Sequence, residues 1–173
     1  MKKLIPVYRV IGYVLIVMAG VLSIFDLLLL LVAIANPGIL VAVVIFTGVI
    51  TYTSACFYFD RRAIQKGKAC KTSLRYIITV TGVIAFIFVV VTLWECINYL
   101  VHPELVNDMS REMLKSQPSY ASAGITKDYL IHLFIGMLYV FMVYCVLLLV
   151  HLMITPRLLK QYGYLFEDRN KQV

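Results

Sequence analysis

The chain has 173 residues, of which 62% are hydrophobic and only 14% charged. A soluble domain is nearer half apolar and a quarter charged, so this composition argues against a water-soluble protein and favours a membrane protein. The net charge of +7 does not by itself indicate nucleic-acid binding. In a membrane protein, an excess of Lys and Arg usually reflects the orientation of the chain in the membrane. We therefore expect the lipid bilayer, and no nucleic acid, as a partner.

The apolar residues fall into four blocks, at residues 10–35, 39–59, 74–101 and 129–154. Each block reaches the roughly 20 residues that a helix needs to cross the hydrocarbon core of a bilayer. Lipid offers no partner to backbone N–H and C=O groups, so each block should be a helix even where it is rich in β-branched residues. We predict an all-α integral membrane protein, a four-helix transmembrane bundle that forms one domain over residues 1–173.

The first block continues far beyond the apolar stretch of a signal peptide and has no A-x-A-like cleavage site, so we expect it to be retained as a helix. It is joined to the second block by "ANPGI", residues 35–39. Asn-Pro and Pro-Gly are strong turn signals. The first two helices should therefore form a tight antiparallel hairpin.

The connection between the second and third blocks, residues 60–73, is short and basic. Its candidate contacts to lipid headgroups or to a partner are Arg61, Arg62, Lys66, Lys68 and Lys71. Such a cluster beside a membrane can hold anionic headgroups, or it can serve only to set the topology. Of the 16 Lys and Arg residues, 13 lie in the N-terminus, near this connection, or in the tail 155–173, all on one side of a four-helix chain. The positive-inside rule predicts that both termini and residues 60–73 are cytoplasmic.

The outer loop, residues 102–128, should contain a short amphipathic helix of about a dozen residues that ends before Pro118. Leu105, Met109 and Met113 recur at every fourth position in it, and Val106 and Leu114 flank them. We expect this helix to lie at the outer interface or to cap the bundle, and Thr126 to cap the fourth membrane helix.

One face of each membrane helix is polar or built from small residues, and we predict that these faces look inward. The first helix has Gly12, Ala19, Asp26 and Ala33; the second Thr47, Thr51, Ser54 and Tyr58; the third Thr81, Ala85, Phe88, Thr92, Glu95 and Tyr99; the fourth His132, Gly136 and Tyr139. Hydroxyl stripes of this kind also arise from ordinary packing, because Ser and Thr often bond a carbonyl of their own helix.

The candidate ion- or proton-binding residues are Asp26, Glu95, His132 and Thr47, which all belong to the outer half of the predicted bundle. A carboxylate deep in a membrane is costly unless it is neutral or paired. Because the cores of the four blocks contain no Lys or Arg, Asp26 has no fixed cation. It should either share a proton or hydrogen bond with Glu95 or His132, or bond Thr47 as a neutral packing contact.

The sequence has no CxxC, HExxH, GxSxG or Gly-rich phosphate loop, so we expect no metal, no cofactor and no enzymatic activity. The four cysteines should be buried as small hydrophobic residues. The favoured function is a non-enzymatic accessory or interaction component that contacts a second copy or another membrane protein. The alternative is a small proton- or cation-linked transporter or channel subunit that uses Asp26 and Glu95. The location would be the inner or plasma membrane if the source is bacterial.

Overall fold

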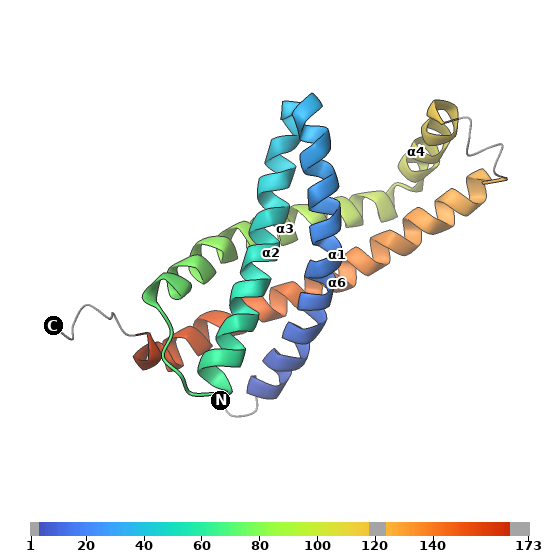
Figure 1. The fold of residues 1–173 in the computed structure, drawn as a ribbon. Helices are drawn as coiled ribbons and strands as arrows, with labels where there is room; N and C mark the ends of the chain where they lie inside the picture. The colour runs from blue at the N-terminus through green and yellow to red at the C-terminus, as the bar shows by residue number, and fades with distance from the viewer. Residues whose placement is uncertain (1–3, 118–123, 167–173) are drawn as a thin grey trace. The chain divides into compact units, whose positions relative to one another are not determined.

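A computed structural model describes residues 4–117 and 124–166, which form helices and their connections (Figure 1). The bounds are α1 Leu4–Ala35, the 3-10 turn η1 Pro37–Ile39, α2 Leu40–Phe59, the π-helical turn η2 Asp60–Ile64, α3 Thr72–Val101, α4 Pro103–Ser116, α6 Lys127–Gln161 and the 3-10 turn η3 Gly163–Leu165. Four helical segments in this part of the chain are long and apolar enough to cross a membrane: Leu4–Ala35, Pro37–Ile64, Thr72–Val101 and Lys127–Gln161. The predicted all-helical architecture is therefore confirmed, together with four helices that could cross a membrane.

The turn between α1 and α2 is as tight as the sequence predicts. Pro37 begins η1, and the side-chain Oδ1 of Asn36 accepts a hydrogen bond from the backbone N–H of Gly38 at 3.2 Å. This contact satisfies a backbone donor that has no partner at the start of a helical turn. The chain therefore reverses within four residues, and α1 and α2 lie side by side as a hairpin (Figure 1).

The chain divides into two compact units. The first unit is Met1–Val89 with Leu147–Val173, and the second is Val90–Val146. The long helices α3 and α6 are each divided between the two units. The prediction of a single membrane domain stays a prediction.

The core of the first unit is formed by segments of all four long helices. Its largest fully buried side chains include Tyr8, Leu15, Tyr52, Phe59, Ile78, Leu148 and Leu158. Gly48 of α2 lies directly against α3: a Cβ added there would stand 2.5 Å from Cγ2 and 3.1 Å from Cβ of Ile84. A small residue at such a position lets two membrane helices approach closely.

Both ends of α6 depend on local chemistry. At its start, the Thr126 hydroxyl accepts a hydrogen bond from the backbone N–H of Tyr129 at 3.3 Å, which confirms the predicted cap. At its end, the sequence predicts a break at Pro156, and this is wrong because α6 continues to Gln161. A proline costs a helix one N–H donor, and packing on neighbouring helices can compensate for that loss in membrane proteins. Leu158 and Leu159, which follow the proline, are both buried.

The predicted inward faces are right in part. Ala19 and Ala33 of α1, and Ala85 and Phe88 of α3, are buried.

On α2 and α6 the prediction is wrong. The buried residues of α2 include Val49, Tyr52, Cys56 and Phe59, whereas Thr47, Ser54 and Tyr58 are exposed. On α6, His132 and Tyr139 are exposed and His151 is buried instead. A hydroxyl can satisfy itself on the preceding turn of its own helix, as Thr79 does on the carbonyl of Arg75 at 2.9 Å, so it need not face the core.

The amphipathic helix predicted between the third and fourth long helices is confirmed as α4, which ends before Pro118 as predicted. Val106 and Ser110 are buried, whereas Leu105 and Met109 are 37% and 43% exposed.

Candidate functional site

Asp26 and Thr47 form a polar pair that joins the two arms of the hairpin. The Thr47 hydroxyl donates a hydrogen bond of 2.7 Å to Oδ2 of Asp26. The Asp26 side chain is half-buried and Thr47 is exposed. The second carboxyl oxygen, Oδ1, is buried and has no hydrogen-bond partner among the described residues. The pair thus holds α1 to α2 while leaving polar atoms that the hairpin itself does not satisfy.

Glu95 and His132 belong to the second unit, and both are exposed. Within the described part of the chain, no hydrogen bond or ion pair joins them. The same residues contain no group of three or more His, Cys, Asp and Glu side chains that could hold a metal ion. The roles predicted for Glu95 and His132 in ion or proton binding stay predictions.

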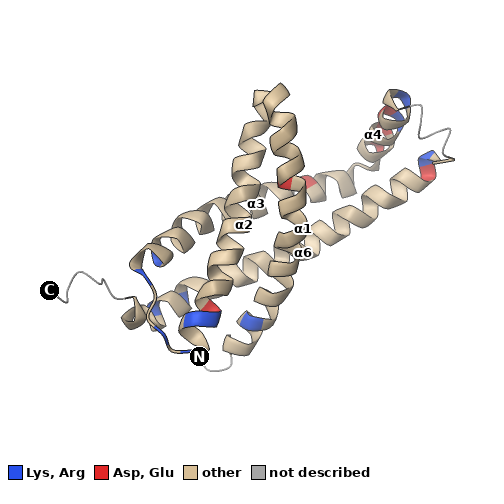
Figure 2. Ribbon diagram, viewed as in Figure 1, with Lys and Arg blue, Asp and Glu red and all other residues tan. Residues whose placement is uncertain are grey.

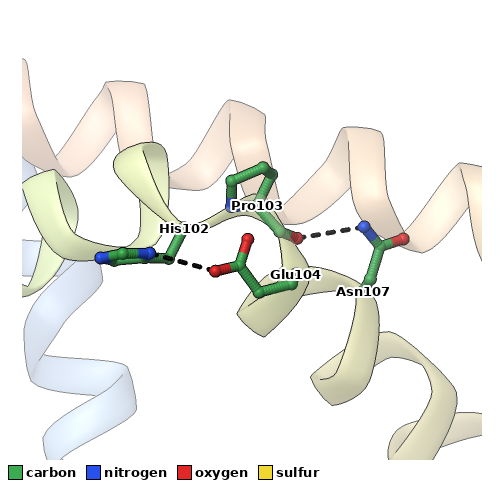
Figure 3. Close-up of polar contacts among 4 residues, drawn as sticks. All are labelled: His102, Pro103, Glu104 and Asn107. Atoms are coloured by element: carbon green, nitrogen blue, oxygen red, sulfur yellow. Dashed lines mark hydrogen bonds and ion pairs between the residues drawn. The ribbon is translucent and has the colours of Figure 1, made fainter.

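His102 instead makes a local contact at the start of α4 (Figure 3). Its Nδ1 lies 3.0 Å from Oε1 of Glu104, and the Asn107 side-chain amide donates to the carbonyl of Pro103 at 3.1 Å. The backbone N–H of Glu104 and then the His102 side chain lower the pKa of the Glu104 carboxyl below its ordinary value. A carboxylate in the first turn of a helix also matches the helix dipole. These contacts order the beginning of α4.

A second polar group, which sequence reasoning missed, lies inside the first unit. We call it the His151 cluster; it comprises Tyr8, Tyr52, His151 and Thr155, none more than 2% exposed. The rings of Tyr8 and His151 stack with centroids 4.3 Å apart, and the Tyr52 ring meets His151 edge-on at 5.8 Å. The Tyr52 hydroxyl lies 3.2 Å from Nδ1 of His151 and 2.9 Å from Oγ1 of Thr155.

Hydrogen counting restricts how this cluster is bonded. Thr155 has one hydroxyl hydrogen, which it donates to the backbone carbonyl of His151 at 2.8 Å. The hydroxyl of Tyr52 is therefore the donor to Thr155, or else to His151 Nδ1. In the first arrangement, His151 Nδ1–H donates to the Tyr52 hydroxyl and the Tyr52 hydroxyl donates to Thr155. Thr155 in turn donates to the backbone carbonyl of His151, so the chain of hydrogen bonds begins and ends at the same residue.

The His151 cluster is a sealed packing element, since water has almost no access to it. Within the cluster, the Tyr8 hydroxyl is the one buried polar atom without a hydrogen-bond partner among the described residues. One sequence signal could have indicated the cluster. His151 and Thr155 are spaced by four residues, so they fall on one face of their helix.

The basic connection is tied to the protein by an ion pair and by hydrogen bonds. Nε of Arg9 lies 3.5 Å from Oδ2 of Asp60, which also accepts a 2.6 Å hydrogen bond from the Gln65 amide. Arg62 donates from Nε to the carbonyl of Ala69 at 3.0 Å and from a terminal nitrogen to the Tyr58 hydroxyl at 2.9 Å. Figure 2 shows the basic residues concentrated at this end of α2 and along the connection to α3.

The same connection is also fastened to the segment that follows α6. The backbone N–H of Cys70 donates to the carbonyl of Leu165 at 2.8 Å, and the rings of Phe59 and Phe166 stack at 5.6 Å. Burial raises the pKa of the Cys70 thiol, an effect that the nearby Arg62 partly opposes. Cys70 and the other three cysteines are all buried, as predicted.

Comparison of the chain with models of protein families, with curated proteins and with solved structures gives no match.

Proposed function

We propose that the protein is a non-enzymatic interaction component of a membrane, in which the α1–α2 hairpin contacts a helix of a second copy or of another membrane protein. The observation that carries the proposal is the Asp26–Thr47 pair, whose threonine is exposed on the surface of the hairpin. Polar side chains on membrane helices associate with other helices, because lipid offers them no hydrogen bond. A partner helix would bond the exposed Thr47 hydroxyl, which keeps a free lone pair after donating its hydrogen to Asp26.

The orientation that goes with this proposal has both termini and the basic connection in the cytoplasm and α4 on the outer side. The distribution of Lys and Arg along the chain supports it. Exposed apolar residues of α4, Leu105 and Met109, would then be available to the outer headgroup layer or to the same partner.

The second candidate is a proton- or cation-linked transporter or channel subunit. The observation that favours it is Oδ1 of Asp26, a buried carboxyl oxygen without a partner in the described residues. Such an oxygen could take up a proton. In this function Glu95 would lie on the outer access route and His132 would tune the site.

Asp26→Asn and Asp26→Leu separate the two candidates. Asparagine is nearly isosteric and keeps the ability to form hydrogen bonds, whereas leucine does not. Association would be measured as energy transfer between two labelled populations in liposomes and as co-purification from native membranes. We expect Asp26→Asn to associate like the wild type and Asp26→Leu to associate about 5- to 30-fold more weakly, the value of one interhelical polar contact.

Proton flux is measured in the same liposomes under a pH gradient. The interaction proposal expects wild type and Asp26→Asn to behave like protein-free liposomes. A wild-type flux that Asp26→Asn abolishes, with normal expression of the variant, would establish the transporter instead. Deletion of residues 104–116 tests the outer helix separately. If this deletion abolishes co-purification of the partner while Asp26→Asn changes neither association nor flux, the transporter is excluded.

A further inference from the structure

We propose that the end of the hairpin where α2 passes into η2 binds an anionic phospholipid, with Arg61 as the residue that holds its phosphate. The inference rests on the proposed membrane insertion, but not on the orientation of the chain or on the Asp26 contact. The proposal gives Arg61 a role that the neighbouring basic residues do not share. From the sequence alone, all of these basic residues are equivalent candidates.

The guanidinium of Arg61 is held by two aromatic rings. Its Cζ lies 5.5 Å from the centroid of Tyr13 in α1 and 5.3 Å from that of Phe57 in α2. The two rings meet edge to face at 5.6 Å. Both distances are within the range of a cation–π contact. Neither contact uses a hydrogen-bond acceptor of the protein, so the N–H groups of Arg61 stay available for a bidentate contact with phosphate.

The charge around Arg61 favours an anion. Residues 60–75 contain six basic residues and one acidic residue, Asp60. Oδ2 of that aspartate is engaged by Arg9 and Gln65. Arg61 itself makes no ion pair within the part of the chain that the structure describes. Lys66, Lys68 and Lys71 are exposed and add a positive field that attracts a headgroup.

Arg62 has a different role, although it is the next residue. Its guanidinium bonds the carbonyl of Ala69 and the hydroxyl of Tyr58, and thereby braces the connection. Two of its three guanidinium nitrogens bond the protein, so we assign it a positioning role. Arg61 is also exposed but makes only ring contacts, which is the arrangement expected of a ligand-binding guanidinium.

The surface of α1 beside Tyr13 suits the acyl chains of the same lipid. Val17 and Ile24 lie within about 40° of Tyr13 around the helix. They are 68% and 64% exposed and carry no polar atoms beyond the backbone. A phosphate at Arg61 and hydrocarbon along this face match the two parts of a phospholipid. That match favours a lipid over a free anion.

The test uses the full chain purified in detergent, with phosphatidylglycerol or phosphatidylcholine added at equal concentration. Native mass spectrometry counts the lipid molecules that remain bound. We expect the wild type to retain phosphatidylglycerol about tenfold better than phosphatidylcholine, and Arg61→Gln to lose most of this preference. Lys115→Gln, which removes a charge from exposed α4, is the matched control and should keep it.

Tyr13→Leu is a second variant, which keeps the charge of Arg61 but removes one ring, and should lose part of the preference even if Arg61→Gln does not fold. Equal retention of the two lipids by the wild type would overturn the proposal, as would an unchanged preference in Arg61→Gln. Displacement of phosphatidylglycerol by inorganic phosphate alone would also overturn it, because the site would then be one for a free anion. Association through Asp26 is scored separately, so the two proposals can fail independently.

Discussion

The Asp26–Thr47 pair and the His151 cluster are both polar contacts between membrane helices of the first unit, but one is open and the other is sealed. In the cluster, Tyr52 and His151 are each 1% exposed and bonded within the cluster. In the pair, Asp26 is half-buried and Thr47, which donates to it, is exposed. A polar group that is satisfied within the fold stabilises that fold. A polar group that is exposed on an otherwise apolar helix would favour association with another helix if that helix lies in a membrane.

The largest effect should come from emptying the cluster. His151→Ala removes a buried ring that stacks on Tyr8 and bonds Tyr52, and should lower the free energy of unfolding by about 3 kcal/mol. His132→Ala makes the same change at an exposed position and should stay within about 0.5 kcal/mol of the wild type. Unfolding by a denaturing detergent in mixed micelles measures both. Equal losses would show that the cluster is no more stabilising than the surface.

A somewhat smaller effect is expected at Gly48, the buried neighbour of exposed Thr47. Gly48→Ala places a Cβ 2.5 Å from Cγ2 and 3.1 Å from Cβ of Ile84, a β-branched side chain that is stiff at this point. We expect a loss of about 1–3 kcal/mol in the same unfolding assay. Gly20→Ala is the control, since nothing lies within 4 Å of its added Cβ. A neutral Gly48→Ala would mean that α2 and α3 do not approach as closely as described.

The smallest stability effect should follow from opening the Asp26–Thr47 pair. Thr47→Val preserves shape but removes the 2.7 Å hydrogen bond, and should cost about 0.6 kcal/mol within one chain. Thr79→Val, which loses only a bond to the preceding turn, is its control. Thr47→Val should nevertheless weaken association, which Thr79→Val should leave unchanged. A Thr47→Val variant that loses stability as strongly as His151→Ala would place the pair in the core.

The sequence predicts the features of this fold that depend on local chemistry. Four apolar blocks locate four helices, Asn36 and Pro37 mark the hairpin turn, and Thr126 marks the start of α6. The contact between Asp26 and Thr47 could also be anticipated, because counting residues from the turn places them at similar depth.

The inward faces of α2 and α6 could not be predicted in this way. In water, a buried face differs from an exposed one in hydrophobicity, but in lipid both faces are apolar and this periodic signal disappears. Tyr52 and His151 therefore look no more buried in the sequence than Tyr58 and His132 do. What distinguishes them is shape, for example the close approach that Gly48 permits, and shape depends on which helices are neighbours.

The most direct test of the central claim is photo-crosslinking from Val44 of α2, which is 60% exposed and lies one turn before Thr47. A photoreactive residue is placed there in native membranes, with Val83 of α3, 58% exposed, as the comparison position. We predict that position 44 crosslinks a polypeptide, either a second copy or another membrane protein, and that Asp26→Leu reduces this product while Asp26→Asn retains it. A probe at position 44 that captures only lipid, or a protein crosslink unaffected by Asp26→Leu, would contradict the claim that the Asp26–Thr47 pair is a contact site for another helix.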